Sequence, residues 1–310
     1  MTTQTTPAEN KALFRTFVDA WNRRDTEQMQ RCWSPDLIHH GRTGALRREQ
    51  VADVMGTFMR AFPDLTFHID ELVADGDYVA ARMTVTATHR DDLGELRATG
   101  RRIEVSVMGQ VRVCGGRIAE HWNVMDELHL MQQLGLAGRG LLDPVTTPDA
   151  SQHTKRTGDR KEAAMTDTPA AQRNIDLVRE FQEKVMHAED YSNTDQYLHP
   201  DLVIHLPAGL IPPGRDEAVK WFKQAADSFT SSGIEVKMMM ADDDSVLQLI
   251  ELHFVHTGDY MGVPATGKEF SIGGLAAFKI KDGKIAEHWG LYDMMSIPAQ
   301  LGIETPGMGF

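Results

Sequence analysis

Two aspartates close two copies of one short segment, and they are the residues best suited to acid–base chemistry. The segment from Arg117 to Asp126 returns as the segment from Lys284 to Asp293, with Glu-His-Trp at its centre both times. Each copy has the pattern of a β-strand, in which alternate residues share a face, so Asp126 ends an apolar stripe that includes Trp122. A carboxyl group among apolar neighbours has its charged form disfavoured, which moves its pKa toward a range useful for proton transfer.

The preceding strand offers two partners for Asp126. Gln110 and Arg112 alternate onto one face of that strand, and Gly115-Gly116 predicts a hairpin that brings the two strands together. In that arrangement Gln110 or Arg112 would hold a developing enolate oxygen while Asp126 moves a proton. Two plainer roles stay open: Asp126 could cap the helix that follows it, and Arg112 could form only a structural ion pair with Asp126.

Histidines and tryptophans recur at matching positions and are the candidates for substrate contact. Two of the histidine pairs lie at strand ends, where a pocket residue and an ordinary polar strand end are both possible. His121 and His288 fall on the opposite face from the aspartates, so we expect them at a sheet surface or interface. The His-x-His and His-x-x-x-His spacings typical of metal sites are absent, so we expect no metal. The candidate substrate-contact residues are His40, His205, His89, His256, Trp122, Trp289 and Trp21.

The elements that position these residues occur in the same order in both halves. In each half, segments with helical periodicity come first, and four strands then follow as an antiparallel meander. The repeat predicts two domains, 1–138 and 170–310, joined by a polar linker at 139–169 that lacks periodicity. In the first half we expect helices over Glu9–Arg24, Gln28–Trp33 and Glu49–Ala61, and strands over Leu37–His40, Leu65–Ala74, Tyr78–His89, Arg102–Cys114 and Ile118–Asp126.

The strand faces opposite the aspartates suggest how the two domains meet. These faces carry Val111, Val113, His121 and Met125, which are neither strongly charged nor fully apolar. Antiparallel sheets leave one face free for a partner, so we expect the two domains to pack sheet against sheet as an internal pseudo-dimer.

The two expected pockets differ in one hydrogen-bonding group. Ala277 stands in the second half where the first half has Gln110, so the second pocket lacks a donor for an oxyanion. We therefore expect the first pocket to be the better equipped of the two.

Several further motifs occur in both halves, and together they resemble the SnoaL-like polyketide cyclases of the NTF2-like superfamily. The resemblance implies two cone-shaped α+β barrels in tandem, each with a curved antiparallel sheet and N-terminal helices around an apolar pocket. It also implies dimers or higher oligomers. The motifs are Trp21-Asn22, Pro35-Asp36, Thr88-His89, Ala98 to Arg101 and Gly116 to Trp122 in the first half, and Pro200-Asp201, His205, His256 to Gly258, Gly262 to Gly267 and Gly283 to Trp289 in the second.

The resemblance also implies a reaction. In these cyclases an aspartate matching Asp126 and Asp293 is the general acid/base of a cofactor-free intramolecular aldol reaction, assisted by a glutamine matching Gln110. Two residues further on, where the cyclases often have histidine, this chain has Arg112, and its second copy has Lys279.

Composition excludes several classes of protein. The chain has 310 residues, 41% of them hydrophobic, and a net charge of −13, which repels nucleic acid and anionic membranes. It contains neither a signal peptide nor an apolar run long enough to span a membrane, so we expect a soluble, cytoplasmic protein. Its two cysteines, Cys32 and Cys114, do not suggest a disulfide framework. No Gly-x-Gly-x-x-Gly or Walker motif occurs, so we expect no nucleotide cofactor.

The sequence supports one leading function and two rivals. The leading function is a cofactor-independent lyase or isomerase, of cyclase, isomerase or dehydratase type, acting on a small apolar carbonyl compound such as a polyketide. An epoxide hydrolase would use Arg112 between two acids, of which Asp126 is one. A non-catalytic carrier would use the same apolar pocket only to bind.

Overall fold

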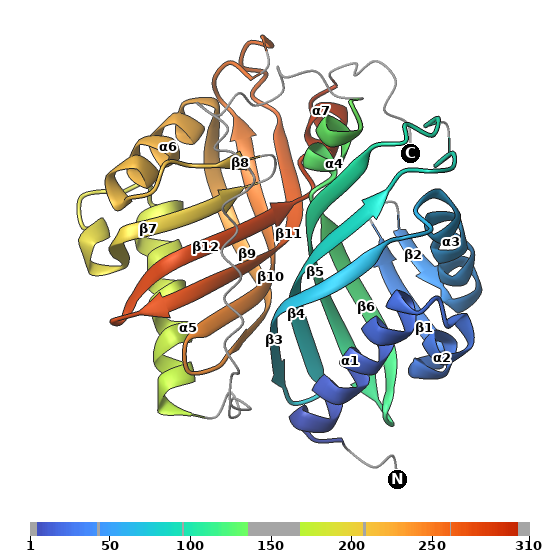
Figure 1. Cartoon of the computed structure of the whole chain (residues 1–310). Coiled ribbons are helices and arrows are strands. Elements are labelled where there is room, and N and C mark those ends of the chain that lie inside the picture. The colour runs from blue at the N-terminus through green and yellow to red at the C-terminus, as the bar shows by residue number, and fades with distance from the viewer. Residues whose placement is uncertain are drawn as a thin grey trace.

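The computed structural model describes residues 5–41, 44–94, 96–135, 168–206, 209–260 and 262–302. These residues form two domains of one kind, each built from a six-stranded sheet with helices packed on it (Figure 1). The two tandem α+β domains predicted from the sequence are therefore confirmed. The predicted linker lies outside the described residues, apart from Thr168 and Pro169 at its end.

The first domain places its helices before most of its strands. Its sheet has the order β2-β1-β6-β5-β4-β3, in which β1 runs parallel to β6 and the other neighbours are antiparallel. Its elements are α1 (Pro7–Asn22), α2 (Thr26–Cys32), β1 (Trp33–Gly41), β2 (Gly44–Arg47), α3 (Arg48–Ala61), β3 (Thr66–Asp75), β4 (Tyr78–Thr88), β5 (Arg102–Cys114), β6 (Arg117–Met125) and α4 (Glu127–Leu134).

The second domain repeats this order, but the π-helix η2 follows its first helix and the 3-10 helix η3 takes the place of α2. Its sheet runs β8-β7-β12-β11-β10-β9, and β7 again pairs in parallel with the last strand. Phe17 matches Phe181 and His40 matches His205, so the second domain holds one extra residue between the two positions, and the π-helix η2 lies in this stretch. Its elements are α5 (Pro169–Phe181), η2 (Gln182–His187), η3 (Thr194–Gln196), β7 (Leu198–Leu206), β8 (Gly209–Leu210), α6 (Arg215–Ser228), β9 (Phe229–Ala241), β10 (Ser245–His256), β11 (Glu269–Lys281), β12 (Lys284–Tyr292) and α7 (Ser296–Leu301).

The helix side of each sheet holds the main hydrophobic core. In the first domain a capping box between Thr6 and Glu9 starts α1, and Phe14 and Phe17 of that helix are buried against the sheet. The residues of β5 that join this core are Ile103 and its valines, including Val107 and Val111. The valine face of β5 is therefore the concave face, because β-branched side chains alternate onto the side that packs against the helices.

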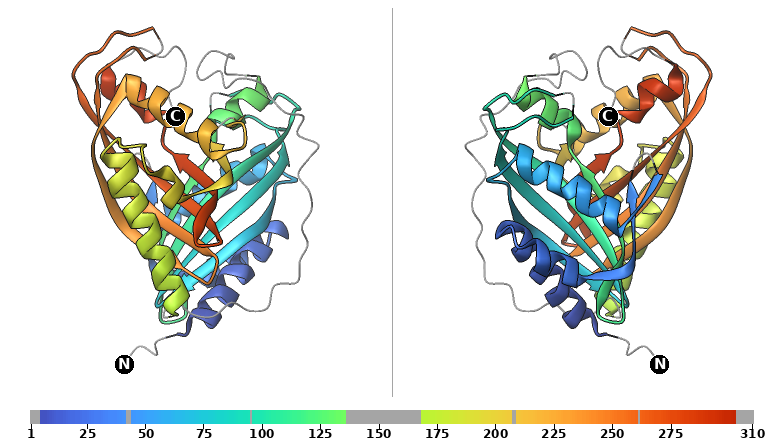
Figure 2. Two further views of the ribbon diagram at one scale, coloured as in Figure 1. Left: turned by 90° about the vertical axis from the view of Figure 1, so that its left-hand side faces the viewer. Right: turned by 90° about the vertical axis from the view of Figure 1, so that its right-hand side faces the viewer.

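The other faces of the two sheets pack against each other. Met108 and Ala80 of the first domain share one hydrophobic cluster with Met240, Leu247 and Leu275 of the second. The two sheets adjoin in the middle of the molecule while α1, α3, α5 and α6 lie toward its outside, and α4 and α7 lie at the same end of the molecule (Figures 1 and 2).

The internal pseudo-dimer predicted from the sequence is thus present, but the predicted contact face is wrong. Val111 and Val113 belong to the helix-side core of the first domain, and Met125 packs against that core. The inter-sheet face instead carries Met108, Gln110 and the residues that alternate with the valines. Among the described residues, no helix combines the length and hydropathy that a membrane crossing would require.

Candidate active site

Asp126 lies in the joint between β6 and α4. Its side chain is 5% exposed, and its backbone N–H donates to the carbonyl oxygen of Ser106 at 3.0 Å. One carboxylate oxygen, Oδ1, accepts the backbone N–H of His129 at 2.9 Å and so caps α4. The capping role left open by the sequence is therefore real, and it fixes the position of the carboxyl group.

Asp293 occupies the matching joint of the second domain. Its backbone N–H donates to the carbonyl oxygen of Gly273 at 3.0 Å, and the Ser296 hydroxyl donates to its carbonyl oxygen at 2.8 Å. Both aspartates therefore sit where the last strand turns into the last helix.

Gln110 does not meet Asp126. Its side chain is 0% exposed, and Nε2 donates to the sulfur of Met238 in the second domain at 2.8 Å. Gln110 lies between the sheets because the valines on either side of it occupy the concave face. The predicted convergence of Gln110 and Asp126 in one cavity is wrong. The expectation that the first pocket is the better equipped depended on that convergence and is no longer supported.

Arg112 pairs with Glu120 and not with Asp126. Its Nε donates to Glu120 Oε1 at 2.6 Å, and Glu120 also meets His40 at 2.8 Å. Burial alone would raise the pKa of Glu120, but hydrogen bonds from His40 and Arg112 lower it. The suggested pairing of Arg112 with Asp126 is therefore wrong.

Each domain stacks a histidine on a tryptophan of the neighbouring strand. The rings of His40 and Trp122 lie 4.4 Å apart and those of His205 and Trp289 lie 4.5 Å apart, nearly parallel in both cases. Trp289 packs against the inter-sheet cluster. These four candidates for substrate contact therefore lie on the side of the sheet that faces away from the helices.

The remaining substrate-contact candidates are buried. His89 and His256 are both 0% exposed, and Nδ1 of each lies within 3.2 Å of a threonine hydroxyl in the loop that follows, Thr99 and Thr266 respectively. Trp21 is 8% exposed and packs edge-on against Phe67 within the core. His89 and His256 therefore hold the loops that follow them, and Trp21 is part of the hydrophobic core.

The sequence interpretation missed His121, which faces the helices rather than a sheet surface. Nδ1 of His121 lies 3.2 Å from Nδ1 of His39, and the ring of Phe17 meets its ring edge-on. Burial, together with the neighbouring histidines, lowers the pKa of His121 to about 3, so the imidazole is neutral. Nε2 of His121 lies over Gly109, 4.0 Å from where a Cβ on that glycine would be. The helix side of the first domain thus holds a neutral histidine on β6, and Asp126 follows that strand at its joint with α4.

His288 takes the matching place in the second domain. It also faces the helix side, where its ring stacks on Phe278 at 4.6 Å. Burial lowers its pKa to about 4. The expectation that His121 and His288 lie at a sheet surface or interface is therefore wrong for both. The apolar residues at every second position of β5 were the signal that could have identified the correct face for both histidines.

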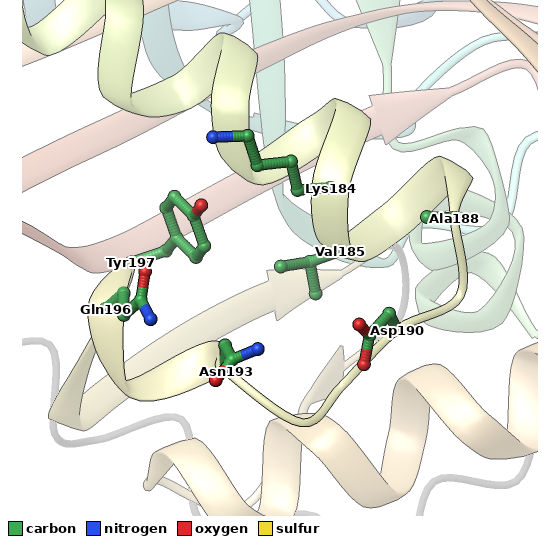
Figure 3. Close-up of a pocket in the computed structure, with 7 residues that line it drawn as sticks. All are labelled: Lys184, Val185, Ala188, Asp190, Asn193, Gln196 and Tyr197. Carbon is green, nitrogen blue, oxygen red and sulfur yellow. The ribbon is translucent and has the colours of Figure 1, made fainter.

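A surface cavity of about 400 Å³ opens beside the π-helix of the second domain (Figure 3). It is lined mainly by polar side chains and lies outside the sheet, and none of the residues around it was a predicted site. Its lining residues are Lys184, Val185, Ala188, Asp190, Asn193, Gln196 and Tyr197.

One group of metal-ligand types comes together on β9 and β10. Ligand atoms of Glu235, Glu251 and His253 lie within 4.8 Å of one another. The ammonium group of Lys237 lies 2.6 Å from Glu235 and 3.0 Å from Glu251, so it already supplies positive charge between the two carboxylates. We interpret this group as a salt-bridge cluster.

Comparison with known proteins identifies a family and several relatives. The family model for SnoaL-like polyketide cyclase matches residues 11–134 and 176–301, which include both domains. Aklanonic acid methyl ester cyclase DnrD of Streptomyces peucetius is 30% identical over 140 residues, which are 43% of this chain and 92% of the relative. The corresponding cyclase DauD of Streptomyces sp. strain C5 is also 30% identical over 140 residues, 43% of this chain and 83% of the relative. The crystal structure of AclR from Streptomyces galilaeus matches with a TM-score of 0.41 at 34% identity, over 43% of this chain and 100% of AclR.

Proposed function

Because the chain belongs to the SnoaL-like polyketide cyclase family, we propose that it is a cofactor-independent cyclase of carbonyl compounds of the polyketide class, with Asp126 as general acid/base. The observation that carries this proposal is the placement of Asp126: 5% exposed, and fixed by hydrogen bonds at the joint between β6 and α4. A shielded carboxyl group of fixed position is suited to moving a proton to and from a bound substrate. Capping uses one of the roughly four lone-pair sites of the carboxylate and does not by itself preclude proton transfer. The other oxygen, Oδ2, lies 3.9 Å from Nδ1 of His129.

The proposed reaction is an intramolecular aldol addition that conserves every atom. Asp126 takes a proton from a carbon next to a carbonyl group, and the resulting enolate carbon attacks a second carbonyl carbon of the same molecule. The new C–C bond leaves an alkoxide, which recovers the proton from Asp126. The net result is an isomer with one more ring and no cofactor consumed.

Two further side chains on the concave face would orient the substrate. Asn123 alternates onto the same side of β6 as His121 and is exposed, so its amide can donate to a substrate oxygen. His121 precedes Asp126 by five residues, about 16 Å along a strand. It would therefore contact the far end of a molecule with several rings. As a neutral imidazole it can donate or accept a hydrogen bond there.

The rival functions are less well supported by the geometry. An epoxide hydrolase would need Arg112 beside Asp126, but Arg112 is bound to Glu120. A carrier would bind the same compounds without converting them, so a turnover measurement distinguishes a carrier from the proposed cyclase.

The test is a turnover assay on aklanonic acid methyl ester, the compound in the names of the two matching cyclases. Chromatography with mass detection would follow its conversion to an isomer of equal mass. We expect Asp126→Asn to lower the rate by on the order of 10²-fold or more, while the helix stays capped because asparagine is as good a cap as aspartate.

Asp293→Asn is the matched control in the second domain. Equal losses in the two variants would indicate two working sites, and an active Asp126→Asn beside an inactive Asp293→Asn would move the reaction to the second domain. Saturable binding of the ester by the wild type without turnover would favour the carrier.

A further inference from the structure

The surface cavity beside η2 combines a polar rim with an apolar floor. Val185, 1% exposed, and Tyr197, 7% exposed, line it and belong to the hydrophobic core of the second domain. In Figure 3 the exposed side chains of Lys184, Asp190 and Asn193 stand around Val185. Because core residues close its floor, the cavity lies outside the interior between the helices and the sheet.

Two local changes in the repeat border this cavity. The stretch with the extra residue contains η2, where the backbone N–H of Ala188 donates to the carbonyl oxygen of Glu183, five residues earlier, at 3.2 Å. Helical segments of this kind are rare and lie frequently at functional sites. The short helix η3 then stands where the first domain has α2, and the side chain of Asn193 does not cap it. Both changes therefore distinguish the second domain at one place.

The lining side chains of η3 also differ in chemistry from their counterparts in the first domain. Gln196 matches Arg31, and Tyr197 matches Cys32. The second domain thus has a neutral amide where the first has a cation, and a phenol where the first has a thiol. Each replacement adds a neutral group that can both donate and accept hydrogen bonds.

The two charged side chains at the rim are already satisfied within the protein. Nζ of Lys184 donates to Glu180 at 2.7 Å, and this hydrogen bond is the main reason why the pKa of Lys184 is raised. The carboxylate of Asp190 accepts the backbone N–H of Ser192 at 2.9 Å, and hydrogen bonds from Ser192 lower the pKa of Asp190. Both groups are therefore charged at neutral pH with opposite signs. An anion would be repelled by Asp190 and a cation by Lys184, which favours a neutral ligand.

We propose that this cavity is a binding site for a neutral, hydroxyl-rich ring compound of the size of one sugar unit. Hydroxyl groups follow from the amides of Asn193 and Gln196, since each offers donors and an acceptor together, as a hydroxyl does. A ring with an apolar C–H face fits Val185 and Ala188. The volume of about 400 Å³ lies near the lower end of the range of about 300–1,000 Å³ for small-molecule sites, which favours a single ring.

The proposal goes beyond the cyclase reaction, and its test does not involve turnover. Ligand-observed NMR would titrate the full chain with methyl β-D-glucopyranoside, methyl β-D-galactopyranoside and methyl α-D-mannopyranoside. We expect saturable binding of at least one of these glycosides. Asn193→Ala should lower the affinity about fivefold, as for the loss of one hydrogen bond. Gln28→Ala is the matched control, because Gln28 occupies the same position in the first domain, and it should leave the affinity unchanged.

A second readout distinguishes a binding residue from a structural one. Asn193 is exposed and does not cap η3, so we expect Asn193→Ala to leave the thermal midpoint unchanged while it weakens binding. Tyr197→Phe is a second variant that removes only the hydroxyl and keeps the ring in the core, and it should weaken binding of the same glycoside. Binding that persists in Asp126→Asn keeps this result separate from success or failure of the proposed reaction.

Three results would overturn the proposal: no saturable binding of any of the three glycosides, unchanged affinity in both Asn193→Ala and Tyr197→Phe, or an equal loss of affinity in Gln28→Ala. Charged probes test the neutral character of the ligand. D-glucosamine, D-glucuronate and the zwitterion L-serine should each bind more weakly than the best of the three glycosides, and tighter binding of any of them would contradict a site for a neutral compound.

Discussion

The guanidinium carbon of Arg82 in the first domain lies 4.2 Å above the ring of Trp289 in the second. Arg82 also reaches Asp70 at 3.3 Å on the neighbouring strand. The residue that matches Arg82 in the second domain is Leu249, so the contact occurs on one side of the pseudo-dimer and has no symmetric counterpart. It joins the two domains through a cation and an aromatic face, an interaction that strengthens when it is shielded from water.

We expect Arg82→Leu to lower the free energy of unfolding by about 1–2 kcal/mol, because it removes this contact and the partly buried pair with Asp70. Urea denaturation followed by fluorescence measures the change. Arg97→Leu is the control, since the Arg97 side chain is 89% exposed in its pair with Asp92, and its effect should stay within about 0.5 kcal/mol. Equal effects of the two substitutions would contradict a role for Arg82 at the interface.

Glu71 of the first domain forms a second link between the domains. Its carboxylate accepts Lys279 Nζ at 3.1 Å and also the hydroxyl of Ser245, both from the second domain. A double-mutant cycle with Glu71→Gln and Lys279→Met should give a coupling energy of about 0.5–3 kcal/mol, as expected for residues in one shielded network. The exposed pair of Glu27 and Arg31 should give about 0.5 kcal/mol or less in the same cycle. A coupling energy no larger than that of the surface pair would show that the link contributes little.

The repeat and the order of the elements could be predicted because they rest on local patterns. Alternation, helical periodicity and the glycine turns predicted the strands and helices in the right order in both halves, except for the short edge strands β2 and β8, which were not predicted. Pairing sheet against sheet also followed from the sequence, since an antiparallel sheet leaves one face free for a partner.

The choice of sheet face failed for a specific reason. The prediction assigned the two sheet faces from the position of Asp126. However, β6 ends at Met125, and the alternation of a strand does not continue into the turn that follows. The valines of β5, including Val107 and Val111, were the better guide, since the core side of a strand is apolar without interruption. With that anchor, Gln110 would have been placed between the sheets and His121 in the interior.

The buried side-chain amide of Gln248, which has no hydrogen-bond partner among the described residues, could not be predicted from the sequence. Whether Gln248 finds a hydrogen-bond partner depends on neighbours that come together only in the fold. Comparing the two halves would still have marked the position, because a glutamine there replaces Ala81 on a face that is otherwise apolar.

The packing of Tyr292 over Gly274 predicts a sharp difference between two adjacent glycines. A Cβ on Gly274 would overlap the tyrosine ring and the carbonyl oxygen of Leu291, whereas a Cβ on Gly273 would meet nothing within 4 Å. We expect Gly274→Ala to lower the free energy of unfolding by about 1–3 kcal/mol, and Gly273→Ala to leave it unchanged or raise it slightly. Urea denaturation of both variants provides the comparison, and similar values would mean that the ring is not held there.

His121 and His288 predict a pH dependence of stability with a definite sign. Burial lowers the pKa of His121 to about 3 and of His288 to about 4, whereas a histidine in the unfolded chain titrates near 6.5. Between about pH 4 and pH 6.5 the unfolded chain therefore binds more protons than the folded one, so the free energy of unfolding rises with pH and is lost as the pH falls. Each histidine adds at most about 1.4 kcal/mol per pH unit to this slope.

Replacing these histidines should flatten the slope in steps. Urea denaturation of His121→Asn and of His288→Asn at several pH values between about 4.5 and 7 should show a smaller slope than the wild type. The double variant should show the smallest slope, because the two residues lie in different domains and their effects should add. His39 contributes to the slope that remains, since burial and the nearby His40 lower its pKa as well. A slope equal to that of the wild type in His121→Asn would mean that this histidine is protonated in the folded interior, and it could not then serve as the neutral group of the proposed substrate site.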